Sequence, residues 1–145
     1  MGDFSQPDKS KFDNVKDKAL INVLYTANWI SRLQNDFFKP FGISRQQYHI
    51  LRILNDSKEA LKVQAIKIRM IERSPNVTRL MDKLYAKALI DRFPSEDDRR
   101  LVLIQITKKG TELLESFSKD FNRDLLKNIT EEEAIQLSDL LNKMR

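Results

Sequence analysis

Nine residues in the middle of the chain have side chains and spacing that suit contact with a polyanion. They are Ser74, Pro75, Asn76, Thr78, Arg79, Lys83, Asp98, Arg99 and Arg100. Arginine and lysine pair with phosphates, and arginine and asparagine also hydrogen-bond to the edges of bases. These residue types therefore indicate binding to nucleic acid rather than chemistry on a substrate.

The positive charge of the chain is concentrated in the same segment. The whole chain has 26 Lys and Arg against 21 Asp and Glu, a net charge of +5. Residues 67–109 carry 11 basic and 6 acidic side chains, whereas residues 110–145 carry 5 basic and 8 acidic ones. This asymmetry favours an anionic partner that docks on the middle segment. An incidental imbalance of surface charge is the alternative.

Composition excludes most kinds of catalytic site. A chain of 145 residues fits one domain, which we expect to span 1–145. Three glycines cannot build a Gly-rich phosphate loop, and the lack of cysteine excludes thiolate nucleophiles and Cys-type metal sites. The glutamates at 131–133 suit the first turn of a helix, where carboxylates face the positive end of the macrodipole. We expect no cofactor, no metal and no enzymatic activity.

Nothing in the sequence predicts a membrane span or a secretion signal. The longest uncharged stretch, residues 19–31, contains two asparagines and is too short to cross a bilayer. The first residues lack an apolar stretch of the signal-peptide kind. We therefore expect a cytoplasmic protein that does not contact a membrane.

Apolar periodicity predicts three helices in the first half of the chain. Leucine, valine and isoleucine recur in steps of three and four over residues 14–39, and Pro40 and Gly42 end that helix. Ser44 and Gln47 form a capping box that begins the next helix. A short third helix is predicted over residues 63–70.

The second half predicts a helix, a hairpin and two further helices. Serine at the N-cap and proline at the first helical position begin a helix at Ser74-Pro75 that runs to about Lys87. Residues 89–93 and 101–106 suit strands, with the polar residues 94–100 as the hairpin tip. Thr107 caps a predicted helix over 108–128, and Thr130 with Glu133 caps the last one.

This order predicts a mainly α (α+β) fold, a winged helix-turn-helix with long flanking helices, in the order α-α-α-α-β-β-α-α. The capped helix would enter the major groove of double-stranded DNA, with Asn76 and Arg79 as base readers and its free N–H groups on a phosphate. Arg99 and Arg100 at the hairpin tip would enter the narrow minor groove, where the potential is strongly negative. The neighbouring Asp98 would hold one of the two arginines in position.

The sequence resembles the MarR family of bacterial transcriptional regulators over residues 66–84, 87–92, 94–103 and 106–110. The family's wing signature, Asp-x-Arg, falls on Asp98 and Arg100. Two positions depart from the family pattern: Ala88 stands where glycine usually precedes the first wing strand, and Ile71 where the turn often has glycine.

The resemblance implies a homodimer held by residues 14–39 and 108–145, with residues 44–106 as the DNA-binding part. It also implies a small aromatic or anionic effector bound between these parts. Aromatic residues of the first two helices are the candidates for an effector pocket, although a plain core or dimer interface explains each one as well. The candidates are Tyr25, Trp29, Tyr48 and His49.

We therefore expect a ligand-responsive repressor that binds a pseudo-palindromic operator as a homodimer. The alternative is a winged helix that binds another protein without specific DNA binding. Salt-sensitive binding to duplex DNA distinguishes the two hypotheses, because only the first requires release of counterions from phosphates.

Overall fold

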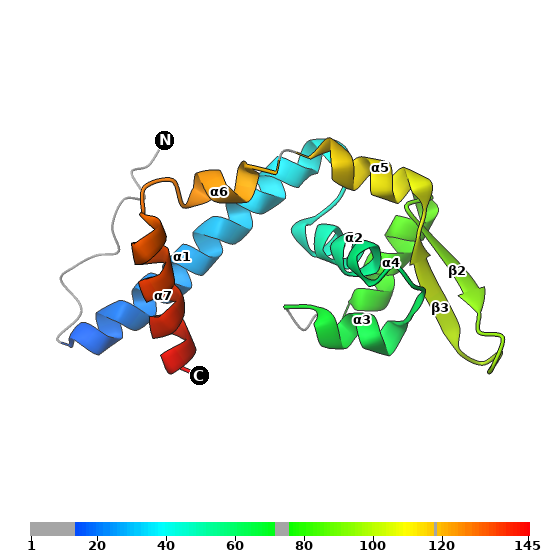
Figure 1. Cartoon of the computed structure of the whole chain (residues 1–145), viewed down its shortest axis with the longest axis horizontal. Helices are drawn as coiled ribbons and strands as arrows, with labels where there is room; N and C mark the ends of the chain where they lie inside the picture. The colour runs from blue at the N-terminus through cyan, green and yellow to red at the C-terminus, as the bar shows by residue number, and fades with distance from the viewer. Residues whose placement is uncertain (1–13, 72–75, 118) are drawn as a thin grey trace. The chain divides into compact units, whose positions relative to one another are not determined.

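The structure is a computed structural model that describes residues 14–71, 76–117 and 119–145. The chain divides into two compact units, one that ends at Leu114 and one that begins at Glu115 (Figure 1). The first unit contains all of the predicted DNA-binding residues. In the described ranges, no helix is apolar over enough residues to cross a membrane.

The first two helices begin and end where the sequence predicts. Helix α1 spans Val15–Phe38, with Asn14 at its N-cap, and the 3-10 helix η2 spans Lys39–Phe41. Gly42 follows at φ 74°, a left-handed conformation that glycine adopts without strain. Helix α2 spans Arg45–Ser57, and its capping box between Ser44 and Gln47 is confirmed.

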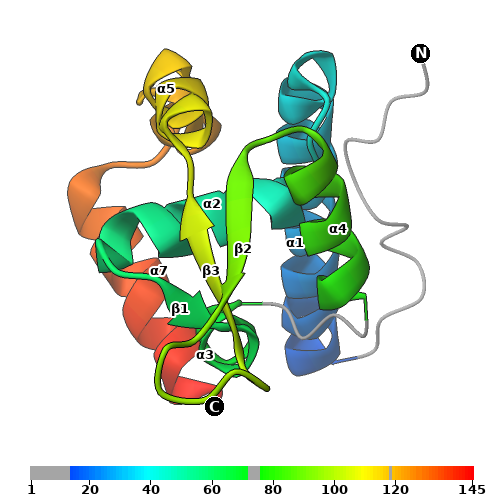
Figure 2. The same cartoon turned by 90° about the vertical axis from the view of Figure 1, so that its right-hand side faces the viewer.

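Residues 44–106, the predicted DNA-binding part, also contain two further helices and a small sheet. Helices α3 and α4 span Val63–Arg69 and Val77–Ala86, and strands β2 and β3 span Ile90–Pro94 and Val102–Ile106. The sequence analysis missed strand β1, Leu61–Lys62, because two residues are too few to show an alternating pattern. The strands are antiparallel in the order β1-β3-β2, as Figure 2 shows.

The core of the first unit lies between α2, α3, α4 and one face of the sheet. Its fully buried side chains are aliphatic residues and one methionine: Ile50, Leu51, Leu54, Ile66, Val77, Met81, Leu84, Ile90 and Ile104. Burying nine such side chains at about 1.5–3 kcal/mol each is the main favourable contribution to this fold. Helix α4 thus shares one core with the hairpin of β2 and β3, which we call the wing.

The start of α4 differs from the prediction. The described helix begins at Val77, two residues later than expected, and the Asn76 carbonyl accepts the Leu80 N–H at 2.9 Å. Asn76 is therefore the N-cap, although its side chain does not accept a backbone N–H of the first turn of α4. The predicted cap pair, Ser74 and Pro75, lies outside the described residues.

A left-handed turn at Ala88 links α4 to the wing. Leu89 N–H donates to the Leu84 carbonyl at 3.0 Å and Ala88 N–H to the Tyr85 carbonyl at 2.9 Å, the paired bonds of a Schellman motif. Ala88 itself has φ 59°. Ala88 therefore adopts a left-handed conformation that usually favours glycine.

Ala88→Gly is expected to raise the free energy of unfolding by about 1 kcal/mol, because glycine has no Cβ to strain at positive φ and Ala88 is exposed. Thermal unfolding at fixed protein concentration measures this. Ala86→Gly, in the last turn of α4, is the matched control and is expected to lower stability by about 1 kcal/mol. Equal effects of the two changes would contradict the strain at Ala88.

The C-terminal helices are shorter than predicted. Thr107 caps α5, Lys108–Ser116, as expected, since its hydroxyl accepts the Gly110 N–H at 3.0 Å. The single helix predicted over 108–128 is wrong, because a second helix, α6, begins at Phe121 and ends at Leu125. Asp120 occupies the N-cap of α6, a position that aspartate favours over a helix interior.

The second unit ends in helix α7, Glu131–Lys143. The capping box between Thr130 and Glu133 is confirmed, and the three glutamates lie in the first turn of the helix. No side chain of α7 is buried. Three of its large apolar residues are exposed on the single chain, Ile135, Leu137 and Leu140, and so is Met144 at its C-cap.

Candidate nucleic-acid interface

The exposed surface of α4 is centred on Arg79. Val77, Met81 and Leu84 are buried, so successive steps of about 100° place Arg79 opposite the core. Lys83 is exposed on one side of Arg79, and Thr78 on the other. Thr78 faces the wing, whereas Lys83 faces the start of α2.

Two cavities confirm this division of α4 into two sides. Thr78 and Met81 line a cavity of about 380 Å³ between α4 and the wing. Lys83 and Lys87 line a groove of about 440 Å³ on the other side of the helix, together with Asp36 of α1 and Lys39 of η2. The lysines give that groove a positive charge.

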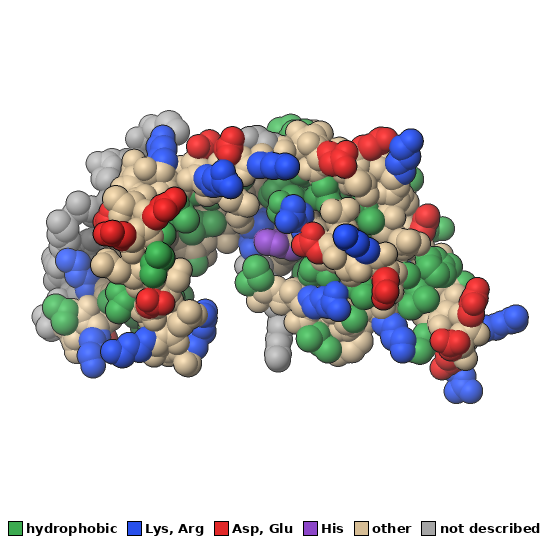
Figure 3. Space-filling model, in the orientation of Figure 1, with side chains coloured by type: hydrophobic (Ala, Val, Ile, Leu, Met, Phe, Trp, Pro, Cys, Tyr) green, Lys and Arg blue, Asp and Glu red, His purple; other side chains and the backbone are tan. Residues whose placement is uncertain are grey.

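Arg99 and Arg100 are the two central residues of a tight turn at the tip of the wing. Leu101 N–H donates to the Asp98 carbonyl at 2.9 Å, which closes the turn around them. Ser95 N–H donates to the Leu101 carbonyl at 2.8 Å and ties the turn to the strands. Both arginines are exposed, and Figure 3 shows charged side chains gathered at the far end of the hairpin.

Asp98 contacts the backbone of this turn. Its Oδ1 accepts the backbone N–H of Arg100 at 3.0 Å. The side-chain hydrogen bond in the structure thus differs from the predicted contact with a guanidinium. An aspartate that accepts the N–H two residues on is typical of turns. Asp98 therefore fixes the backbone from which Arg100 projects.

Gln47 anchors α4 to the start of α2. The side chain is 4% exposed, its Oε1 accepts the Ser44 N–H at 2.9 Å, and its Nε2 donates to the Leu80 carbonyl at 3.3 Å. The sequence predicted the capping role of Gln47 but not its second contact. A buried amide that bridges two helices restricts how α4 can shift.

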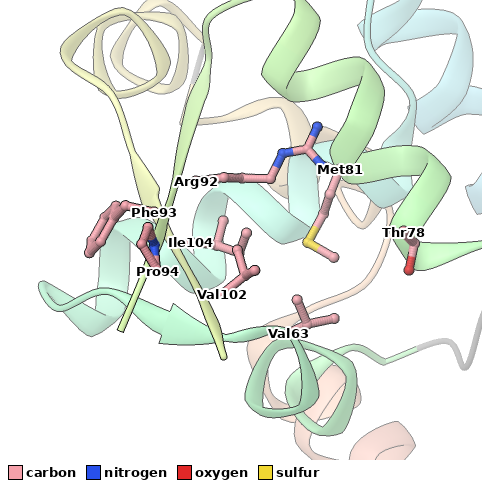
Figure 4. A pocket seen from close by; sticks show the side chains of 8 residues that line it. All are labelled: Val63, Thr78, Met81, Arg92, Phe93, Pro94, Val102 and Ile104. Carbon is pink, nitrogen blue, oxygen red and sulfur yellow. The ribbon is translucent and has the colours of Figure 1, made fainter. Parts of the chain in front are cut away.

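Sequence reasoning also missed Arg92. Its Nη1 donates to Asp82 Oδ1 at 2.7 Å, and its guanidinium carbon lies 4.4 Å from the centre of the Tyr85 ring. Asp82 and Tyr85 belong to α4, whereas Arg92 belongs to β2. Figure 4 shows the Arg92 side chain reaching from the strand toward the helix. The pairing depends on the tertiary fold, so no local pattern reveals it.

The four candidate effector residues lie in the first two helices. Tyr48 stacks on Phe38 with ring centroids 4.4 Å apart, and His49 meets Tyr48 edge-on at 5.7 Å. Tyr25 and Trp29 are half-buried in α1. The two cavities that flank α4 are lined by other residues, so an effector role for these four stays a prediction.

A helix-turn-helix followed by an antiparallel hairpin with a cationic tip defines a winged helix DNA-binding protein. The comparisons with known proteins agree with this class. The family model described as the MarR family matches residues 43–102. Those limits lie close to the winged helix predicted at 44–106.

Curated relatives match most of the chain. It is 32% identical to the uncharacterized HTH-type transcriptional regulator YdgJ of Bacillus subtilis strain 168, over 85% of this chain and 77% of that protein. It is 28% identical to the multiple antibiotic resistance protein MarR of Escherichia coli K12, over 78% of this chain and 81% of that protein. The chain belongs to the MarR family and is a DNA-binding transcriptional regulator.

Two similar solved structures contain DNA. One is a mutant of E. coli MarR complexed with operator DNA, which is 25% identical with a TM-score of 0.74 and covers 90% of this chain and 94% of that chain. The other is the S. aureus MepR–DNA complex, which is 25% identical with a TM-score of 0.75 and covers 88% and 94%.

Proposed function

We propose that the protein binds a pseudo-palindromic operator as a homodimer and represses transcription until a small ligand releases it. The observation that carries the proposal is the placement of Arg79 and the Arg99–Arg100 turn on one compact unit. Arg79 is the outermost residue of α4, and the wing that carries the turn shares the core of α4. One unit can therefore contact the major groove and the adjacent minor groove together.

Each side chain has a role in this arrangement. Arg79 reads base edges in the major groove, with Asn76 and Thr78 beside it, and Lys83 pairs with a phosphate. Arg100 enters the minor groove, Arg99 contacts the neighbouring backbone, and Asp98 fixes their turn. For Ser74 and Pro75 we propose a phosphate contact at the start of α4.

The homodimer is supported by apolar side chains that face solvent on the single chain. In α1, Leu20 is 49% exposed and Leu24 is 54% exposed. In α7, Ile135 and Leu140 are each 62% exposed. Aliphatic faces on two helices outside the DNA-binding part suit association with a second copy. A two-fold axis between two winged helices would set half-sites about one helical turn apart.

Salt dependence of binding tests this function. Each protomer presents four exposed cations to the DNA in this proposal: Arg79, Lys83, Arg99 and Arg100. The dimer therefore makes roughly eight phosphate or groove contacts. Raising salt from 50 to 200 mM is then expected to weaken operator binding by about a thousandfold or more. Fluorescence anisotropy with labelled duplex DNA measures the slope. Duplex binding that is absent or insensitive to salt would favour the alternative, a winged helix that binds another protein.

Response to an effector has a separate readout, because Trp29 is the only tryptophan. If the ligand binds beside Tyr25, Trp29, Tyr48 and His49, titration with benzoate as an aromatic anion is expected to change tryptophan emission and release operator DNA in parallel. Phe37→Trp, one residue before the aromatic stack of Phe38, provides a second probe at the same helix. Release of DNA without any change in emission from either probe would place the ligand elsewhere.

The proposal includes no catalytic step and places the protein in the cytoplasm, where the chromosome of a bacterial cell lies. Support for both statements comes from the family, whose members are regulators. Incubation with operator DNA and benzoate should leave both molecules chemically unchanged.

A further inference from the structure

Three side chains connect the wing to α4 across their exposed edge. Arg92 of β2 makes a 2.7 Å ion pair with Asp82 and covers the ring of Tyr85 at 4.4 Å. Asp82 and Tyr85 are three residues apart on α4 and therefore lie on the same side of the helix. We name Asp82, Tyr85 and Arg92 the clamp.

The clamp spans a region where the wing and α4 do not pack tightly. Beside the clamp lies the cavity of about 380 Å³, lined by Val63 of α3, by Thr78 and Met81 of α4, and by residues of the wing that include Phe93, Pro94 and Val102 (Figure 4). The chain itself joins the two elements only at the turn around Ala88. The base of the hairpin is held by the buried Ile90 and Ile104, whereas Phe93, Leu101 and Val102 nearer the tip are 37%, 38% and 43% exposed. The angle of this less buried half can change at a lower energetic cost than that of the base.

We propose that the clamp sets the angle of the wing relative to α4, so that Arg79 and Arg100 reach their grooves at the same time. Asp82, Tyr85 and Arg92 are then positioning residues that act through the DNA-contacting arginines. This inference rests on the proposed function, which assigns α4 to the major groove and the wing tip to the minor groove.

Because the clamp side chains are partly exposed, removing one of them is expected to change DNA binding without changing the stability of the fold. The Arg92 and Asp82 side chains are 31% and 55% exposed. Ion pairs of this exposure contribute little to stability, so thermal unfolding should barely change when one partner is removed. Losing a contact that orders the wing instead lowers the fraction of molecules with both arginines in place.

The test compares four proteins: wild type, Asp82→Ala, Arg100→Ala and the double variant. Asp82→Ala is expected to weaken operator binding about fivefold, although it removes a negative charge from the DNA-facing helix. Arg100→Ala is expected to weaken operator binding roughly a hundredfold in the wild-type background, but only about tenfold when Asp82 is alanine. Asp82→Glu keeps the carboxylate and should restore most of the affinity.

Asp91→Ala is the matched control, because Asp91 is an exposed carboxylate on β2 next to Arg92 and removing it changes the charge equally. It is expected to strengthen binding slightly on operator and scrambled duplexes alike. If Asp82→Ala also strengthens binding to both duplexes, Asp82 only repels DNA and the proposed role of the clamp is wrong. An equal loss of operator affinity on Arg100→Ala in both backgrounds also contradicts the proposed role of the clamp. No cost of Arg100→Ala in the wild type overturns the proposed role of the wing instead.

Discussion

Arg100→Ala is expected to weaken binding to operator DNA by roughly a hundredfold. Each half-site loses one guanidinium contact in the minor groove, at about 1–3 kcal/mol, and a dimer loses two. The narrow minor groove concentrates negative potential, so a cation inserted there contributes more than one on the outer backbone. Titration of a labelled operator by fluorescence anisotropy, at one salt concentration, measures the change.

Arg100→Ala removes the guanidinium but is expected to leave the backbone of the turn intact. Alanine at 100 keeps the backbone N–H that Asp98 accepts at 3.0 Å, so the turn should persist. Arg99→Ala is the matched control at the adjacent position. It is expected to weaken operator binding less than tenfold, because a contact with the outer phosphate backbone contributes less than one in the narrow minor groove. Arg100→Lys should recover only part of the loss, because lysine lacks the planar guanidinium. An unchanged affinity for Arg100→Ala would rule out the minor-groove contact.

Arg79→Ala is expected to reduce the preference for operator over scrambled DNA by about tenfold or more. Arg79 is the residue of α4 that projects farthest from the buried Val77, Met81 and Leu84, so it is best placed to reach base edges. A bidentate contact between arginine and guanine contributes about 1–3 kcal/mol of discrimination, and both half-sites lose it. The ratio of dissociation constants on the two duplexes is the measured quantity.

Lys83→Ala provides the contrast on the same helix. Lys83 lies to the side of Arg79, with Lys87 in the groove next to α2, where a phosphate is the expected partner. Its loss should weaken binding to both duplexes equally and reduce the salt slope by about one. If Arg79→Ala also weakens both duplexes equally, Arg79 touches only phosphates and the base reader must lie elsewhere on α4.

The sequence by itself determined the helices and the wing strands, because each depends on residues close together in the chain. Capping boxes at Ser44 and Thr130 are confirmed, as are both wing strands to within one residue. Exposure of Arg79, Lys83, Arg99 and Arg100 is also confirmed, since cations remain in water unless they are paired.

Predictions at helix ends were less successful, because competing local preferences differ there by little free energy. Asn76 takes the N-cap of α4, and Asp120 begins a separate helix where one continuous helix was predicted. Aspartate, asparagine and serine all favour caps and turns, so a sequence that offers several of them does not select one. The packing of the buried residues decides between them.

Only the tertiary structure decided which residues hold the interface in place. Gln47 reaches the Leu80 carbonyl 33 positions away, and Arg92 meets Asp82 because the register of β2 carries it back beside α4. Ala88 adopts positive φ because the paired bonds of its turn enforce it, although its residue type disfavours that conformation. Local preferences therefore specify the parts that touch DNA, whereas contacts between distant segments set their relative positions, since those contacts exist only after the chain has folded.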